Sequence, residues 1–207
     1  MTGIAPSKIV CVGRNYLAHA REMGNEVPAQ PMLFLKPPSA LIGPGDAIVI
    51  PPESKQVEYE AEIGVVIGQR LRRVIAAVAE RGIRGFTCVN DVTARDLQKT
   101  DGQWGRAKGF DSFCPAGPSV VNGLDWRRLE VIGRVNGEER QRGKAAEMHF
   151  DIPGLLAFIS NAMTLEPGDL VLTGTPAGVG PLRAGDEVEV EIPGVGVLRN
   201  PVRAEAA

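Results

Sequence analysis

Residues 57–68 read V-E-Y-E-A-E-I-G-V-V-I-G, and this stretch constrains the fold more than any other. In a strand, successive side chains point to opposite faces, so Glu58, Glu60 and Glu62 share one face. The alternation then stops, and the run from Val65 to Ile67 is continuously apolar, which is typical of a strand buried on both faces. The stretch therefore predicts a strand that leaves a polar surface and enters a core, with carboxylates at its entrance.

The same alternation occurs in residues 186–192, which read D-E-V-E-V-E-I. We interpret these glutamates as a solvated strand face, because they alternate with valines and a Pro-Gly turn follows. Charged side chains are mostly exposed in folded proteins, so the alternation by itself favours a surface for residues 58–62 as well. The rest of the chain has to decide between a surface and a site.

The length and composition favour one domain with many short strands. The chain has 207 residues, enough for one sizeable core, and it shows no linker, internal repeat or low-complexity segment. We therefore expect a single domain over residues 1–207. The 25 Gly and 16 Pro residues divide the chain into short strands and turns, which predicts a β-rich α+β fold.

Charge and hydropathy exclude several classes of partner. The formal net charge is −2 with both signs interspersed, which argues against nucleic acid or an anionic membrane. No apolar run approaches the roughly 20 residues of a membrane-spanning helix, and the N-terminus lacks a signal-peptide pattern, so we expect a soluble, cytoplasmic protein. The scattered Cys11, Cys88 and Cys114 fit neither a zinc site nor a disulfide framework, and we expect them to be reduced and structural.

Periodicity and turn residues predict the remaining elements. A hairpin over 129–140 is expected around Asn136-Gly137, and a β-ribbon over 186–202 is expected to close the chain. A long loop is expected over 100–118 and a glycine-rich loop over 173–180. Further strands are predicted at 8–13, 32–36, 47–50, 85–92 and 169–172, and helices at 16–23 (capped by Asn15), 71–81, 93–99 and 151–163 (capped by Asp151).

Three carboxylates at two strand ends form a candidate metal site. Glu60 and Glu62 precede one buried strand, and Asp91 ends another. An all-oxygen set of this kind suits Mg²⁺ or Mn²⁺, with Ca²⁺ as a further candidate. Ionised carboxylates packed together repel one another, so such a buried cluster needs a cation or must bind protons. The spacing alone leaves the surface alternative open.

Two other groups suggest acid–base chemistry. His19 and Glu22 are three residues apart on the predicted helix, where a carboxylate can orient an imidazole as a general base. An incidental surface pair is the commoner explanation of such spacing. For Lys108 the default is a solvated lysine on the loop, and for His149 it is packing or capping at a helix entry. The loop at 173–180 can offer N–H groups to an anion but lacks the Walker pattern, which argues against a nucleotide site.

Taken together, the segments resemble the fumarylacetoacetate hydrolase family over nearly the whole chain. They are K-I-V-C-V-G-R-N-Y, F-L-K-P, Y-E-A-E-I-G-V-V-I-G, N-D-V-T-A-R-D-L-Q, K-G-F-D and L-T-G-T-P-A-G-V-G. The resemblance implies a mixed β-roll with a metal site between sheets, and a homodimer. The chain begins close to G-R-N-Y, which implies the short acylpyruvate-hydrolase-like branch rather than the fumarylacetoacetase that degrades tyrosine.

The resemblance also implies roles for individual residues. Glu60, Glu62 and Asp91 correspond to metal ligands, and His19 with Glu22 to a pair on a mobile lid helix that activates water. Lys108 corresponds to a lysine that holds substrate oxygens. Arg95, Gln98 and Thr175 correspond to residues that contact substrate, whereas Glu58 receives no role.

The implied function is Mg²⁺- or Mn²⁺-dependent hydrolysis of a carbon–carbon bond in a small 2,4-diketo acid of the acylpyruvate or fumarylpyruvate type. The same site in related proteins decarboxylates or tautomerises oxaloacetate, or isomerises 2-hydroxyhepta-2,4-diene-1,7-dioate in aromatic catabolism, and these activities remain alternatives. The non-enzymatic alternative is a metal-stabilised protein that binds small acids without turning them over.

Overall fold

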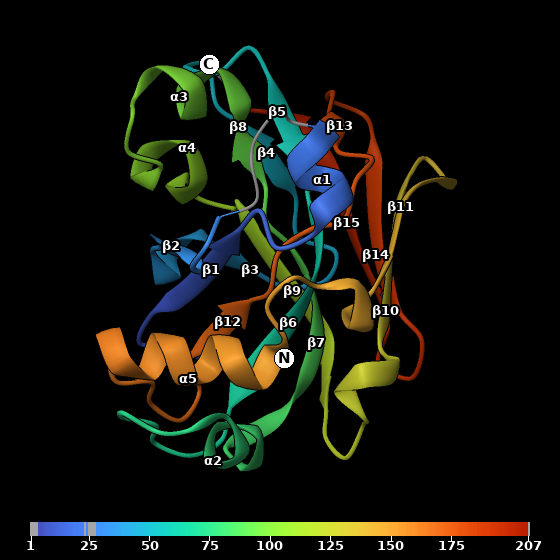
Figure 1. Ribbon diagram of the computed structural model, residues 1–207. Helices are drawn as coiled ribbons and strands as arrows, with labels where there is room; N and C mark the ends of the chain where they lie inside the picture. The colour runs from blue at the N-terminus through green and yellow to red at the C-terminus, as the bar shows by residue number, and fades with distance from the viewer. Residues whose placement is uncertain (1–3, 23, 25–27, 207) are drawn as a thin grey trace.

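The computed structural model describes residues 4–22, 24 and 28–206, and its largest element is a seven-stranded mixed sheet (Figure 1). Strand β6, which contains the apolar run of residues 65–67, lies at the centre of this sheet. In spatial order the strands are β2 (Met32–Lys36), β1 (Ile9–Gly13), β12 (Leu170–Leu172), β6 (Ala61–Ile67), β7 (Ile83–Asn90), β9 (Cys114–Val121) and β3 (Leu41–Ile42).

Strand β6 is buried on both faces, as its sequence predicts. Ile63, Val65 and Ile67 pack into one hydrophobic core, whereas Val66 packs into a second core on the opposite face. The first core also receives helix α5 (Ile152–Ala162) and the five-stranded sheet. Hydrophobic cores on both sides of the strand therefore explain why its apolar run is continuous rather than alternating.

The five-stranded sheet packs against the first and contains the two predicted ribbons. Its spatial order is β11 (Glu138–Lys144), β10 (Glu130–Val135), β14 (Glu187–Ile192), β15 (Gly196–Ala204) and β4 (Ile48–Ile50). The β10–β11 hairpin turns at Asn136 and Gly137, which both have positive φ (53° and 78°), so the Asn-Gly prediction is confirmed.

A third sheet of short strands lies next to two short helices. It has the order β13 (Gly180–Pro181), β5 (Val57–Tyr59) and β8 (Thr93–Ala94). Helix α3 (Arg95–Thr100) follows β8 directly, and α4 (Gly105–Gly109) comes next in the chain. Figure 1 shows both helices at one end of the molecule, together with α1 (Leu17–Glu22).

The remaining helices support the cores. Helix α5 begins at Asp151, whose side chain accepts a hydrogen bond from the Gly154 N–H as the predicted cap. Helix α2 (Ala76–Arg81) packs against α5. Short 3₁₀ helices are Pro38–Ala40, Trp126–Arg128 and Ala145–Glu147. Within the described ranges, no helix has the length and apolar character needed to cross a membrane.

Three local predictions were wrong. The helix expected from residue 71 begins at Ala76, because Leu71 exchanges backbone hydrogen bonds with Leu165 instead. The loop expected over 100–118 contains α4 and the start of β9. The side chain of Asn15 bonds the carbonyls of Phe150 and Thr173 and the Phe150 N–H rather than capping α1. The helix expected over 16–23 runs from Leu17 to Glu22, and Met23 lies outside the described residues.

The alternating glutamates of β14 are more exposed to solvent than the buried glutamates of residues 58–62. Glu187 is exposed, and Glu189 and Glu191 are partly exposed and paired with Arg134 and Arg199. The glutamate face of this strand is exposed to solvent, as predicted, although two of its three glutamates have arginine partners.

A buried carboxylate ties the start of β12 to the start of β1. Asp169 is fully buried and accepts hydrogen bonds from the backbone N–H groups of Ser7 (3.0 Å), Lys8 (3.2 Å) and Glu166 (2.8 Å). It also pairs with the Lys8 ammonium. Burial alone would raise the pKa of Asp169, but these hydrogen bonds together lower it below its usual value.

We predict that Asp169→Asn destabilises the protein by about 1–3 kcal/mol at pH 7, because the amide cannot accept the same set of hydrogen bonds. The folded-state pKa is lowered, so the stabilisation is present above the ordinary aspartate pKa of about 3.9 and is lost as the pH falls through the folded value. Denaturant unfolding should therefore show a difference between variant and wild type that shrinks below about pH 4. The exposed Asp111→Asn serves as a control, and a difference that did not change with pH would contradict the assignment.

Candidate active site

The predicted site residues surround one cavity of about 260 Å³ at the mouth of β6. All of them line it except Glu22, which contacts it through His19. The lining residues among them are His19, Glu60, Glu62, Asp91, Arg95, Gln98, Lys108 and Thr175. Residues that lie up to 156 positions apart in the chain are thus brought together around a volume suited to a small molecule.

Backbone contacts hold the two acidic strand ends together. Glu60 lies between β5 and β6, and its N–H donates to the Asn90 side chain (2.9 Å). Its carbonyl accepts the Asp91 N–H (2.8 Å). Two residues further, Glu62 pairs with Val89 in the β6–β7 ladder. The register of these two strands therefore fixes the spacing of the three carboxylates.

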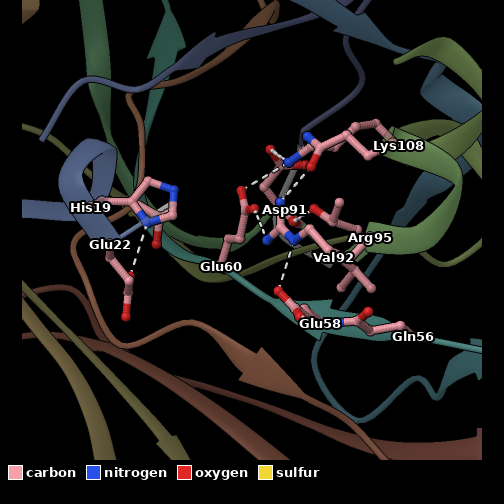
Figure 2. Close-up of polar contacts among 12 residues, drawn as sticks. His19, Glu22, Gln56, Glu58, Glu60, Asp91, Val92, Arg95 and Lys108 are labelled. Carbon is pink, nitrogen blue, oxygen red and sulfur yellow. Dashed lines mark hydrogen bonds and ion pairs between the residues drawn. The ribbon is translucent and has the colours of Figure 1, made fainter. Parts of the chain in front are cut away.

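Buried cations from three elements bond Glu60 and Asp91, and Figure 2 shows two of these cations, Lys108 and Arg95. The Lys108 ammonium, on α4, donates to Glu60 (2.8 Å) and to Asp91 (2.6 Å). Lys36, at the end of β2, donates to the other oxygen of Asp91 (2.6 Å), and Arg95, at the start of α3, donates to Glu60 (2.6 Å). Because Lys108 is buried and bound to two carboxylates, the default of a solvated surface lysine was wrong.

This arrangement gives the three carboxyl groups different electrostatic surroundings. Burial favours the neutral form of Glu60, but Lys108 and Arg95 outweigh it and hold the pKa of Glu60 well below its usual range. The pKa of Glu62 is raised well above its usual value by burial and by the charges of Asp91 and Glu60. The nearest donor to Glu62 is the Gly174 N–H at 2.7 Å. Burial opposes the charge of Lys108 too, but Asp91 and Glu60 raise its pKa.

The donor set fits a hard divalent cation. One carboxylate oxygen from each of Glu60, Glu62 and Asp91 can be chosen so that all three lie within 4.8 Å of one another. All three residues are buried, and the set contains only oxygen, the ligand atom that Mg²⁺, Mn²⁺ and Ca²⁺ prefer. Among the described residues, Glu62 forms no ion pair, whereas Glu60 and Asp91 each have two cationic partners, so positive charge is lacking on the Glu62 side of the cluster.

His19 and Glu22 form the expected pair and are anchored by the glycine-rich loop. The Nδ1 atom of His19 lies 3.3 Å from the Glu22 carboxylate, and His19 is 7% exposed. Both Glu22 oxygens accept the Gly178 N–H, at 3.0 and 3.1 Å. The loop at 173–180 therefore donates to protein carboxylates, at Gly174 and Gly178. With Nδ1 directed at Glu22, Nε2 is left as the proton-accepting atom.

Arg95 is held by a set of side chains on one edge of the cavity. Its Nε donates to Glu58 (2.7 Å), and its two terminal nitrogens donate to Glu60 and Gln98 (each 2.6 Å). Gln56 in turn donates to the second oxygen of Glu58 (2.6 Å). Glu58, which received no role from the sequence, therefore fixes the orientation of Arg95.

The hydroxyl of Thr175 lines the cavity but is bonded inside the protein. It donates to the carbonyl of Ala61 (2.9 Å) and accepts from the Gln141 amide (2.8 Å). Its contact with a substrate carboxylate stays a prediction. His149 is exposed and packs edge-on against Phe150, so the expectation of core packing there was wrong.

Sequence reasoning missed Lys36 and the aromatic wall of the cavity. Phe34 and Lys36 are two residues apart on β2 and therefore share a face, and that alternation was the available signal. Trp104 packs edge-on against Phe34, with ring centroids 5.3 Å apart, and Lys108 lies 5.0 Å from the centre of the Phe34 ring. The three cysteines are free and buried, as predicted.

Comparison with known proteins finds relatives and solved structures that match nearly the whole chain. The structure of 5-carboxymethyl-2-hydroxymuconate delta-isomerase from Mycobacterium smegmatis superposes with a TM-score of 0.93 at 47% identity, covering 100% of this chain and 82% of that one. Mitochondrial oxaloacetate tautomerase FAHD2A of Bos taurus is 44% identical, over 95% of this chain and 67% of the relative. The structure of fumarylpyruvate hydrolase from Pseudomonas aeruginosa, in complex with Mn²⁺ and pyruvate, has a TM-score of 0.92 at 32% identity, covering 98% and 91%.

The model of the fumarylacetoacetate hydrolase C-terminal family matches residues 8–203. The match includes both acidic strand ends, the three buried cations and the His19–Glu22 pair. The chain therefore belongs to the fumarylacetoacetate hydrolase family.

Proposed function

We propose that this protein is a divalent-metal-dependent hydrolase that cleaves the carbon–carbon bond of small 2,4-diketo acids of the acylpyruvate type. The observation that carries the proposal is the His19–Glu22 pair at a cavity whose floor is the buried triad of Glu60, Glu62 and Asp91. A general base next to a hard-cation site is the combination that such a hydrolysis requires. The Mn²⁺ and pyruvate complex of the fumarylpyruvate hydrolase supports the same chemistry.

His19 performs the proton transfers in this reaction. Its Nε2 accepts a proton from a water molecule while Glu22 holds Nδ1, and the resulting hydroxide adds to the distal carbonyl carbon. The bond between this carbon and the neighbouring methylene carbon then breaks, and its electron pair leaves with the pyruvate fragment as an enolate. The proton on His19 returns to that fragment, so that water and the diketo acid yield a carboxylic acid and pyruvate.

The remaining groups bind the substrate and stabilise its charge. Glu60, Glu62 and Asp91 would hold the metal, which when bound supplies Lewis-acid stabilisation of the negative charge that develops on the pyruvate fragment. The Lys108 ammonium has three hydrogens, of which Glu60 and Asp91 engage two, so one is left for a substrate oxygen. Arg95 and Gln98 orient the substrate from the opposite edge, and Phe34 and Trp104 exclude water from one side.

Oxaloacetate tautomerisation is a second candidate. Oxaloacetate tautomerase is 44% identical to this chain, whereas fumarylpyruvate hydrolase is 32% identical. Tautomerisation moves a proton between carbon and oxygen of a 2-oxo acid and needs no attacking water. It uses the same stabilisation of an enolate, so only the reaction of each substrate separates the two candidates.

We predict that His19→Ala lowers kcat for cleavage of acetylpyruvate and fumarylpyruvate by about 10²–10⁴-fold, the contribution typical of a general base. Pyruvate release in the presence of Mg²⁺ is the measurement, and the exposed His149→Ala is the matched control with unchanged rates. Turnover of oxaloacetate alone, retained in His19→Ala, would instead identify a tautomerase or decarboxylase. Binding of these acids with no turnover of any of them would identify a binding protein.

We also predict that EDTA abolishes turnover but leaves the protein folded, because Lys36, Lys108 and Arg95 already oppose the buried carboxylates. Circular dichroism and thermal unfolding measure the fold, and coupled pyruvate detection measures activity. Lys36→Met leaves one oxygen of Asp91 without its cation and should destabilise the metal-free protein by about 3–5 kcal/mol. Unfolding of the wild type on chelation would show that the metal, rather than these side chains, maintains the cluster.

A further inference from the structure

The cavity contains more cations than its buried carboxylates engage. Four basic residues line it, namely Arg14, Arg95, Lys99 and Lys108. Arg95 uses all three of its nitrogens on Glu58, Glu60 and Gln98, and Lys108 bonds Glu60 and Asp91. These two cations therefore balance the acidic floor of the site.

Arg14 and Lys99 are different. Across residues 4–22, 24 and 28–206, neither side chain has a hydrogen bond or ion pair with the protein. The carboxylates that line the cavity are Glu60, Glu62 and Asp91, which are bonded to other groups or placed to hold the metal. Arg14 is half-buried and Lys99 is exposed, so both lie toward the mouth of the cavity rather than at its floor.

The backbone at Arg14 is held in an unusual conformation by its neighbours. Its φ is 58°, in the left-handed region that non-glycine residues seldom adopt. The following residue, Asn15, is locked by side-chain hydrogen bonds to Phe150 and Thr173, and the preceding Gly13 packs against Trp104. Such strain persists where the surrounding structure over-determines it, and it is concentrated at ligand-binding sites.

The cavity therefore has an acidic floor, an aromatic wall and a cationic rim. A 2-oxo acid held by the metal at the floor neutralises charge there with its own carboxylate and oxo oxygens. A ligand that ends at the rim in a methyl group leaves Arg14 unpaired, whereas one that ends in a carboxylate gives Arg14 a charge-assisted hydrogen-bond partner. A guanidinium is suited to this task because its fork matches a carboxylate in two-point geometry.

We propose that Arg14, assisted by Lys99, forms a subsite for a second carboxylate, so that the protein selects dicarboxylic 2-oxo acids over monocarboxylic ones. The inference rests on the proposed function for the placement of the 2-oxo acid end at the triad. It assigns a substrate class within that function, with fumarylpyruvate-like diacids as substrates and acetylpyruvate-like monoacids as poor ones.

The test uses a matched pair of ligands that cannot be cleaved. The two compounds 2-oxoglutarate and 2-oxopentanoate have the same number of carbons and the same 2-oxo acid end, and they differ in a terminal carboxylate against a terminal methyl group. Each compound is titrated into the Mg²⁺-loaded protein by isothermal calorimetry. We expect 2-oxoglutarate to bind about 10- to 100-fold more tightly than 2-oxopentanoate, because one or two charge-assisted hydrogen bonds provide an affinity difference of this size.

Three variants locate the discrimination. Arg14→Gln is expected to reduce the preference to less than about 3-fold by weakening 2-oxoglutarate alone, and Arg14→Lys to retain part of it because the charge remains. Lys99→Gln should have a smaller effect of the same sign. Arg72→Gln removes an equal charge at an exposed position away from the cavity and should change neither affinity.

The outcomes separate this inference from the proposed function. A preference that is lost in Arg14→Gln supports the subsite even if no acylpyruvate is cleaved. Equal affinities for the two ligands, or no binding of 2-oxoglutarate, would reject the subsite. In that case, equal kcat/KM values for fumarylpyruvate and acetylpyruvate would leave the hydrolase proposal standing, with the second carboxylate playing no part in it.

Discussion

The balance of charge around Asp91 and Glu60 is the constraint on which the rest of the structure depends. Ionised groups are costly to bury unless they are paired and hydrogen-bonded, and here each of these carboxylates bonds two cations. The cations come from β2 and from the consecutive helices α3 and α4, which follow much later in the chain. The proposed metal site thus requires that β2 dock correctly against α3 and α4, and these segments also form walls of the cavity.

The position of the site follows from the two-sided burial of β6. Hydrophobic cores on both faces of the central sheet leave its strand ends as the place where polar groups can gather around an opening. Glu60 lies in the break between β5 and β6, so the chain changes from one sheet to the other at the residue that bonds both Arg95 and Lys108. The candidate site residues lie around this junction between the central sheet and the small three-stranded sheet.

Strand positions could be predicted from the sequence, because they depend on local alternation and turn residues. The acidic triad could be predicted only from the resemblance to the family, because the alternation by itself favours a surface. The cations that pair with these carboxylates could not be predicted from the sequence. The alternation along β2 places Lys36 on the same face as Phe34 but does not identify Asp91 as its partner. Glu58 resembles the surface glutamates of β14 in sequence, and only the structure shows its pairing with Arg95. The helix expected from Leu71 failed for a similar reason, since a pairing with Leu165, 94 residues away, competes with the local apolar spacing.

The hydrogen bond between the Asp91 N–H and the Glu60 carbonyl has a consequence for folding. Because side chains alternate along a strand, a slip of one residue between β6 and β7 would turn Glu62 to the opposite face from Asp91. The cluster would then be divided between two compartments of the protein. If the proposed metal binds there, a chain folded in the wrong register would be recognisable by its indifference to divalent ions, and metal binding would report strand pairing.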